Sequence, residues 1–233
     1  MKYSVHRALA MLKTTKARIE RELSDKEILW VRVARGQEDV VSGIAVKDIQ
    51  RDIQAHYDRI TALISNYTKI KAAVIRSNAG VTPGTELRKV DIAGQALTVA
   101  EIIELVDTVY GRAGKPGFKA KLLSKMKNDY GAAQRDFDDM QERVDEEVSQ
   151  YVRTLAGKKR EAEETDATAK SLIEATSKML HEQKDPRIID PLKIADKIKA
   201  LENEIEAFRT ESDAILSEQN ALTTIELDLT EVK

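Results

Sequence analysis

Apolar residues recur at helical spacing over long stretches of the chain. Between Val46 and Val74 the seam positions, which include His56, alternate steps of three and four over four heptads without a skip. Between Ile194 and Gln219 the seam positions alternate steps of four and three, with Ser212 and Gln219 as polar members. This is the spacing of coiled-coil seams. Both stretches therefore predict long helices that pack through narrow apolar stripes. The seam residues expected at helix contacts are Ile49, Ile53, Ile60, Leu63, Ile198, Leu201, Ile205 and Phe208.

Two shorter helices are predicted as well. Residues 4–23 carry one apolar stripe that only Lys16 interrupts, which indicates an amphipathic first helix. Thr98 and Glu101 have the spacing of a capping box, in which each side chain accepts a hydrogen bond from the backbone N–H of the other. This box predicts a short helix that begins after Thr98 and runs to Tyr110.

The stretch from residue 118 to residue 183 contains no proline. An apolar stripe runs along its first part, so the pattern predicts one long helix with a bend at Gly157. Asp190 and Pro191 then have the residue types of an N-cap and a first-turn proline. They predict that the last long helix begins at this point.

β-Branched residues and alternating patterns occur in three places outside these helices. Residues 28–35 favour a strand that pairs with residues 40–44 as a hairpin, and residues 86–93 alternate apolar and polar positions. A last alternation over residues 223–229 suits an edge strand that pairs within the chain or with a neighbour. The candidate contact residues of this C-terminal strand are Thr223, Ile225 and Leu227.

Composition agrees with a mainly α fold. Charged residues make up 33% of the 233 residues and aromatic residues 4%, so the core must come from Ile, Leu, Val and Ala. We expect a single elongated helical domain over residues 1–233, built from long antiparallel coiled-coil-like helices with a small β element, a C-terminal strand and a helical expansion at 118–183. No apolar run has the length of a membrane span or a signal-peptide core, which predicts a soluble, unexported chain.

The chain offers little material for catalysis. It has no cysteine, which excludes disulfides, thiolate zinc sites and a cysteine nucleophile. The segment from Gly111 to Pro116 lacks the earlier glycine and the Ser or Thr of a phosphate-binding loop, so we interpret it as an exposed loop. His6, His56 and His181 fall on different predicted helices without an evident carboxylate constellation, and His56 is interpreted as a polar seam residue that sets register. We therefore predict a protein that is not an enzyme and has no cofactor and no metal site.

Charge is unevenly distributed along the helix predicted from residue 118. The 38 Lys and Arg nearly balance the 40 Asp and Glu overall, which argues against a globally basic nucleic-acid binder. However, five lysines without an intervening acid occupy residues 115–127, and acidic residues dominate residues 136–147. Lysines near a helix start oppose the macrodipole, which indicates an external acidic partner; a solvated face is the alternative. Stacked copies would bring the basic stretch of one against the acidic stretch of the next. The candidate contact residues are Lys119, Lys121 and Lys125.

Three blocks of sequence, in order, carry a family resemblance. They are residues 8–23, residues 60–68 followed by 96–101, and residues 219–227, which include an Asn-x-x-Thr-Thr signature. Together they resemble a small helical family of uncharacterised bacterial and phage proteins, some of which carry the label septicolysin. The resemblance implies a helical hairpin with a β excursion and, through the phage members, a virion or phage-encoded accessory protein. It implies no catalytic residues.

These observations favour a non-enzymatic structural or assembly protein, present in multiple copies in a tailed-phage virion. We expect it to associate with itself or with other virion proteins, and not with a membrane. Its location would be the virion if it is phage-encoded, and the cytoplasm otherwise. Two alternatives stay open: a nucleic-acid-contacting accessory or packaging protein that uses Lys115–Lys127, and a septicolysin-like toxin.

Overall fold

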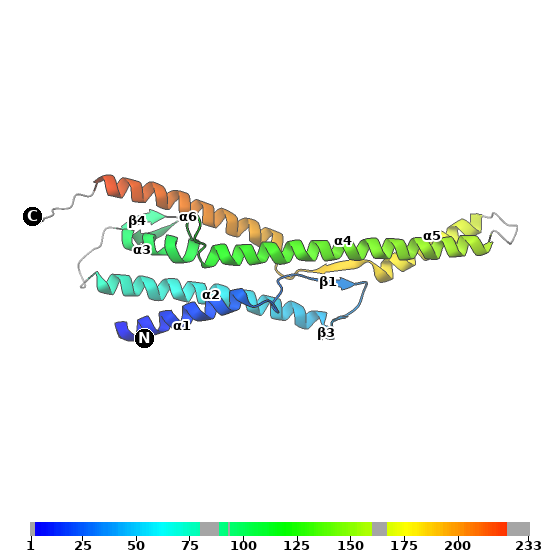
Figure 1. The fold of residues 1–233 in the computed structure, drawn as a ribbon, viewed down its shortest axis with the longest axis horizontal. Helices are drawn as coiled ribbons and strands as arrows, with labels where there is room; N and C mark the ends of the chain where they lie inside the picture. Colours follow the sequence, from blue (N-terminus) through cyan, green and yellow to red (C-terminus); the bar gives the residue numbers. More distant parts are fainter. Residues whose placement is uncertain (1–2, 80–88, 93, 160–166, 223–233) are drawn as a thin grey trace, which may run out of the picture. The chain divides into compact units, whose positions relative to one another are not determined.

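The computed structural model describes residues 3–79, 89–92, 94–159 and 167–222 (Figure 1). Most of these residues are helical, so the predicted mainly α fold is confirmed. The helices are α1 (Val5–Ser24), α2 (Val46–Asn78), α3 (Val99–Leu105), α4 (Phe118–Lys159), α5 (Ala167–Lys184) and α6 (Ile194–Leu222), with a π-helix, η1 (Val106–Tyr110), that continues α3. The strands are β1 (Arg32–Arg35), β2 (Val40–Val41), β3 (Ile44–Ala45), β4 (Lys89–Ile92), β5 (Gln95–Thr98) and β6 (Pro186–Ile189).

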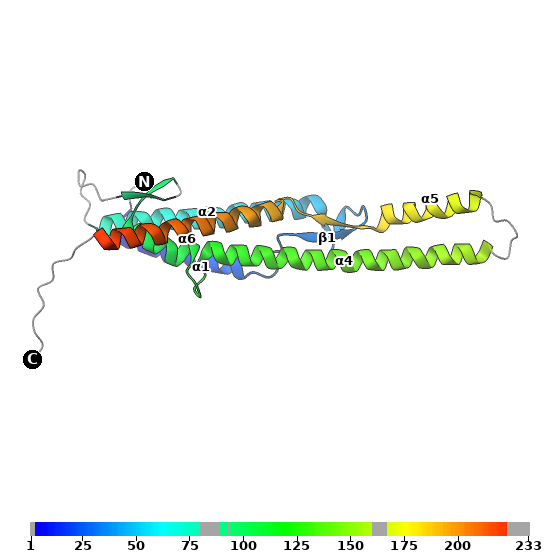
Figure 2. The same ribbon diagram turned by 90° about the horizontal axis from the view of Figure 1, so that it is seen from above.

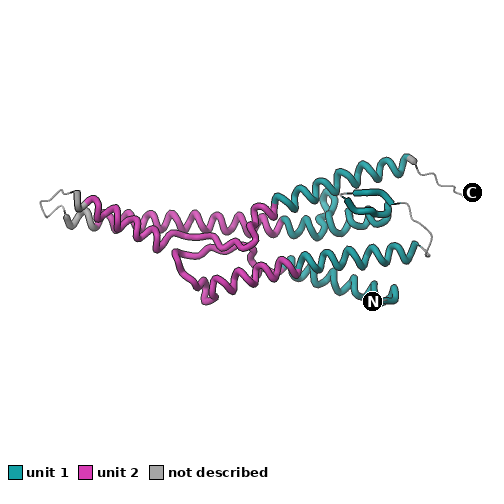
Figure 3. Tube along the Cα trace, turned by 180° about the vertical axis from the view of Figure 1, so that it is seen from behind, with its two compact units in different colours: residues 1–24, 60–123, 199–233 teal, residues 25–59, 124–198 magenta. Residues whose placement is uncertain are grey.

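The chain divides into two compact units (Figure 3). Unit 1 comprises residues 1–24, 60–123 and 199–233, and unit 2 comprises residues 25–59 and 124–198. The division falls within α2, α4 and α6, so each unit contains a part of these three helices. The predicted single domain over residues 1–233 stays a prediction.

In unit 1, the second half of α2 packs against α3 and the start of α4. Ile60 is fully buried, in agreement with the predicted seam. Tyr67 of α2 meets Phe118 of α4 edge to face, with 5.1 Å between the ring centroids. Lys71 of α2 forms an ion pair of 3.2 Å with Glu104 of α3. An apolar contact and a charged one therefore hold α2 against its two neighbours.

The predicted capping box at the start of α3 is confirmed. The Glu101 backbone N–H donates to the Thr98 hydroxyl at 3.3 Å, and the Thr98 N–H donates to the Glu101 carboxylate at 2.8 Å. The other oxygen of this buried carboxylate lies 2.8 Å from Nε of Arg76 on α2. Strand β5 leads into this cap and pairs with β4, with Lys89 opposite Thr98. The predicted β element over 86–93 is therefore found at 89–92, while residues 86–88 and 93 lie outside the described residues.

The loop after η1 closes on itself. Arg112 and Lys115 exchange two backbone hydrogen bonds of 3.0 Å, and the residues between them are exposed, as predicted for this loop. At its base the backbone of Gly111, with φ of +81°, lies close to that of Gly117. A Cβ atom on Gly111 would lie 2.3 Å from the Gly117 nitrogen, so this close approach requires glycine.

In unit 2, the predicted pairing of residues 28–35 with residues 40–44 is wrong. Strand β1 pairs instead with β6, antiparallel, with Arg32 opposite Ile189. Residues 40–45 form their own hairpin of β2 and β3, joined by Ser42 with φ of 51° and Gly43 with φ of 80°. Two successive residues with positive φ are typical of the tight type I′ hairpin. This local turn takes up the residues that would otherwise pair with β1.

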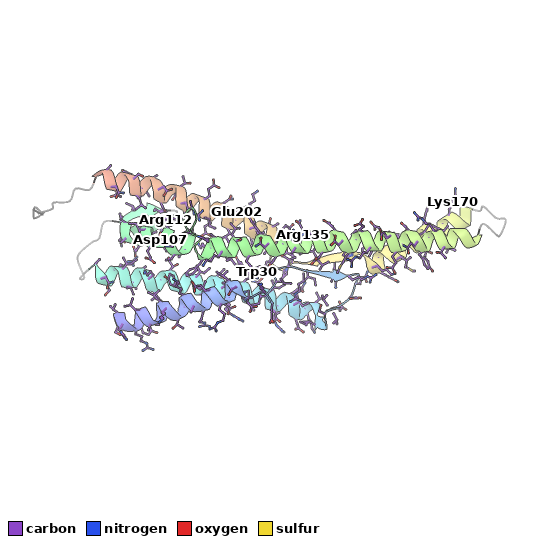
Figure 4. All side chains as sticks on the ribbon, viewed as in Figure 1. Trp30, Asp107, Arg112, Arg135, Lys170 and Glu202 are labelled. Carbon is purple, nitrogen blue, oxygen red and sulfur yellow. The ribbon has the colours of Figure 1, made fainter. Side chains whose placement is uncertain are left out.

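Trp30 lies at the centre of unit 2 packing and is completely buried (Figure 4). Its ring is 4.7 Å from that of His56 and 6.1 Å from that of Tyr57, both on α2. Its backbone N–H donates to the Asp129 carboxylate of α4 at 3.4 Å. One tryptophan thus contacts two of the helices that contribute to this unit.

The single helix predicted over residues 118–183 is also wrong. Helix α4 continues through Gly157 to Lys159, and α5 runs back along it in the opposite direction (Figures 1 and 2). Val144 and Val148 of α4 are buried. A lone helix would leave such a stripe in water, whereas an antiparallel hairpin covers apolar positions on both helices.

The start of α6 differs from the prediction by one turn. Helix α6 begins at Ile194, whose N–H donates to the Asp190 carboxylate at 2.8 Å. Asp190 therefore bonds the first helical N–H, as an N-terminal acid is expected to do. Pro191 lies in the preceding turn rather than in the helix.

Candidate interaction surface

The seam residues predicted at helix contacts are largely covered within this single chain. Two of them are half-buried, and the others are between 0% and 9% exposed. Their apolar surface is therefore already removed from water without a second chain. The half-buried residues are Ile198 and Leu201, and the buried ones are Ile49, Ile53, Ile60, Leu63, Ile205 and Phe208.

Phe208 shows how the α6 seam is used in unit 1. Its ring stacks on that of Tyr110 from η1, with 3.8 Å between the centroids and 8° between the planes. The next residue, Arg209, donates to the Tyr110 carbonyl oxygen at 2.6 Å. Stacking and hydrogen bonding together fix α6 on η1.

Lys119, a candidate contact residue, forms hydrogen bonds to the same two elements, η1 and α6. Its ammonium donates to the Glu204 carboxylate of α6 and to the Tyr110 hydroxyl, the latter at 3.2 Å. Burial is the largest single effect on the Lys119 pKa, and it lowers that pKa. The hydrogen bonds and charges of Glu204 and Tyr110 together raise it by more, so the pKa lies above the ordinary lysine value. Burial has the opposite effect on Tyr110, whose charged form is the deprotonated one, and raises its pKa. Lys119 offsets part of that rise. The structure thus gives Lys119 an acidic partner in its own unit.

The other lysines of this stretch differ from one another. Lys125 lies 3.5 Å from Asp129, one turn along α4, and both side chains are largely buried. Lys115 lies 3.9 Å from Asp107, which also pairs with Arg112 at 2.7 Å (Figure 4). Lys121 is exposed. Because acids of the same unit lie beside Lys115, Lys119 and Lys125, these three lysines do not require an external acidic partner.

The predicted C-terminal strand over residues 223–229, with its contact residues Thr223, Ile225 and Leu227, lies outside the described residues.

An exposed apolar stripe follows α5 in unit 2. Leu172 and Met179, two helical turns apart, are 55% and 49% exposed, and Ala175 between them is exposed too. Ile173 and Leu180, on the adjoining face, are half-buried. We call Leu172, Ala175 and Met179 the α5 stripe. Sequence reasoning missed it because it assigned α5 to the end of one longer helix, although the steps of three and four were visible.

An acidic hollow lies on the α4 surface of unit 2. Its volume is about 660 Å³, and all the residues that line it come from one face of α4. Four of them carry carboxylates and one is basic, so the hollow favours cations. The lining residues are Asp138, Gln141, Glu142, Asp145, Glu146, Ser149, Gln150 and Arg153.

His181 has the carboxylate constellation that sequence reasoning did not find. Its Nδ1 lies 2.9 Å from an Asp185 oxygen and 3.8 Å from an Asp145 oxygen on α4. These three residues could supply metal ligands, so two carboxylates that the sequence alone did not place beside His181 lie there. The separation of four between His181 and Asp185 was a visible signal, whereas Asp145 is brought in by the helical hairpin.

The fold and these surfaces define a helical protein with a helical hairpin in unit 2. Comparisons of the chain with protein-family models, curated proteins and solved structures find no match. Among the described helices, none is both long and apolar enough to cross a membrane. The resemblance to the septicolysin-labelled family stays a prediction.

Proposed function

We propose that the protein is a non-enzymatic structural or assembly protein that associates with a second copy of itself through the α5 stripe. One observation carries the proposal: two large apolar side chains, Leu172 and Met179, are about half exposed at helical spacing on one face. Single exposed apolar residues are ordinary, but a pair at heptad spacing is typical of a helix that docks on another helix. Burying the exposed half of each side chain would contribute about 1 kcal/mol.

The sequence of α5 also supports pairing between copies. Consider two antiparallel α5 helices related by a two-fold axis between Ala175 and Thr176. Leu172 of one copy then faces Met179 of the other, and the exposed Glu174 of one copy lies within one residue of the level of the exposed Lys178 of the other. Apolar residues therefore meet apolar residues, and opposite charges lie at nearly the same level. This self-complementarity is what an isologous contact between identical chains requires.

The setting that we propose is a tailed-phage virion that contains multiple copies of the protein. This part rests on the sequence resemblance and on the predominance of long helices, which suit a rigid assembly component. The nucleic-acid alternative receives less support, because Lys115, Lys119 and Lys125 each lie near an acidic partner in the same unit. Mass spectrometry of purified particles from a phage that encodes the protein would test the setting directly.

The experiment that tests self-association is light scattering of the purified chain over a concentration series. We expect a concentration-dependent oligomer, and we expect Leu172→Gln with Met179→Gln to weaken association at least tenfold without changing the formal charge. The matched control is Val5→Gln with Leu9→Gln, since these α1 side chains are exposed to a similar degree. A monomer at every concentration would overturn the proposal. Loss of association in the α1 variant alone would show that the contact lies on α1 instead of α5.

A further inference from the structure

Three side chains of the types that bind metal ions lie close together in unit 2, where the end of α5 packs against α4. This cluster consists of Asp145 from α4, His181 from the last turn of α5, and Asp185, which directly follows α5. One ligand atom from each residue lies within 4.8 Å of the other two. The Gln141 amide nitrogen donates to both carboxylates, at 2.9 Å to Asp145 and 3.2 Å to Asp185. Two helices therefore bring an imidazole and two carboxylates together.

The spacing suits a small divalent ion. Zn²⁺ binds imidazole nitrogen and carboxylate oxygen at about 2.0–2.2 Å, so its ligand atoms lie roughly 3–4 Å from one another. The His181 nitrogen is already 2.9 Å and 3.8 Å from the two aspartate oxygens. Only a small adjustment of the Asp145 and Asp185 side chains is needed to reach this geometry. Turning the Gln141 amide would present its carbonyl oxygen to the fourth position, which water would otherwise fill.

The electrostatic surroundings also favour a cation. The carboxyl end of a helix carries a partial negative charge, and here it coincides with two aspartates. The acidic hollow on α4 includes Gln141 and Asp145 and adds further carboxylates beside the cluster. Two nearby basic groups, Lys184 and Arg35, pair with Glu147. The hollow contributes one more, Arg153, against its four carboxylates. Negative charge is therefore concentrated around His181, and a bound cation would relieve it.

We propose that Asp145, His181 and Asp185 form a binding site for a divalent transition-metal ion, with Zn²⁺ as the best match. A mixed set of imidazole and carboxylate ligands suits Zn²⁺, because harder ions prefer oxygen alone. Since its ligands come from both helices, the ion would fix the carboxyl end of α5 on α4. The proposal does not depend on self-association, because all three ligands belong to one chain.

The test is a titration of the full chain with CoCl₂ and ZnCl₂. We expect one Co²⁺ per chain to give visible absorption bands that Zn²⁺ removes, and calorimetry to give a Zn²⁺ dissociation constant of about 10 μM or lower. His181→Gln and Asp145→Asn should each weaken binding at least tenfold. Zn²⁺ should raise the melting temperature of the unchanged chain but not that of His181→Gln.

Two controls separate this cluster from other surface ligands. His6→Gln removes an exposed histidine on α1, and Glu142→Gln removes a carboxylate of the hollow outside the cluster; both should retain the Zn²⁺ affinity. Circular dichroism of the metal-free variants checks that each one folds, and Asp185→Asn provides a second carboxylate variant. A dissociation constant above about 10 μM for the unchanged chain would overturn the proposal. Equal affinity in His181→Gln would overturn it too.

Discussion

Replacing Phe208 by alanine tests whether the α6 seam belongs to the core of the chain. Phe208 was a candidate contact residue on sequence grounds, and the structure buries it to 1% exposure against Tyr110. If the contact is intramolecular, its loss must destabilise the isolated chain at any protein concentration. If the residue instead served a contact between chains, its effect would depend on concentration.

The expected magnitude follows from the burial of this ring. Truncation of a buried phenylalanine to alanine costs about 3–5 kcal/mol, because apolar surface and packing are lost and a cavity is left. The stacked pair with Tyr110 accounts for about 0.5–1.5 kcal/mol of that loss. Phe208→Leu keeps most of the volume and should cost less than about 1.5 kcal/mol.

Urea unfolding followed by circular dichroism, at two protein concentrations, measures these differences. With a slope of about 2 kcal/mol per molar urea, Phe208→Ala should lower the midpoint by about 1.5–2.5 M, whereas Phe208→Leu should lower it by less than about 0.8 M. Both shifts should be the same at the two concentrations. A loss below about 1 kcal/mol for alanine, or a loss that shrinks on dilution, would refute the assignment of Phe208 to the core.

Three further outcomes follow from the structure. Gly36→Ala should lower the melting temperature more than Gly43→Ala: both have positive φ, but a Cβ at Gly36 would lie 1.9 Å from a backbone oxygen, whereas nothing lies within 4 Å at Gly43. Because burial raises the pKa of Tyr110, its contribution to stability is fully present below about pH 10 and is lost as pH rises further. Burial also raises the pKa of Tyr67, so absorbance at 295 nm should show two tyrosines that titrate late in the unchanged chain and one in Tyr110→Phe. The hydrogen bond from Lys184 lowers the pKa of Glu147. The Lys184–Glu147 pair therefore contributes to stability at neutral pH, and this contribution is lost as pH falls below about 4. The difference in melting temperature between the unchanged chain and Glu147→Gln should accordingly close in acid.

The long helices could be predicted from the sequence because helical periodicity is local. The seam between Val46 and Val74 falls within α2, and the alternation from Ile194 to Gln219 falls within α6. The capping box at Thr98 was equally accessible, since its two partners are three residues apart. In each case the residues that decide the structure lie within a few turns of one another.

Pairings between distant segments could not be predicted in this way. Arg32 lies opposite Ile189, and no local pattern in β1 indicates that β6 is its partner. The reversal between α4 and α5 was hidden for a related reason: residues 160–166 contain neither proline nor glycine. No helix-breaking residue type in this segment therefore marked a boundary between the two helices.

The charged groups show the same limit. Lys119 appeared to need an external acid because Glu204, its partner, is 85 residues away in sequence. His181 appeared isolated because Asp145 lies on another helix. Helical spacing identifies which residues share a face, but which faces meet depends on how the helices are arranged.

The proposed metal site and the proposed contact surface share one helix, so they should be coupled. Met179 of the α5 stripe lies two residues before His181, whose ligation would hold the end of α5 on α4. A helix that is already held in place loses less conformational entropy when a second copy docks on it. Zn²⁺ should therefore strengthen self-association of the unchanged chain in light scattering and have no effect on His181→Gln. Self-association that is insensitive to Zn²⁺, in a chain that binds the ion, would show that docking does not require α5 to be fixed on α4.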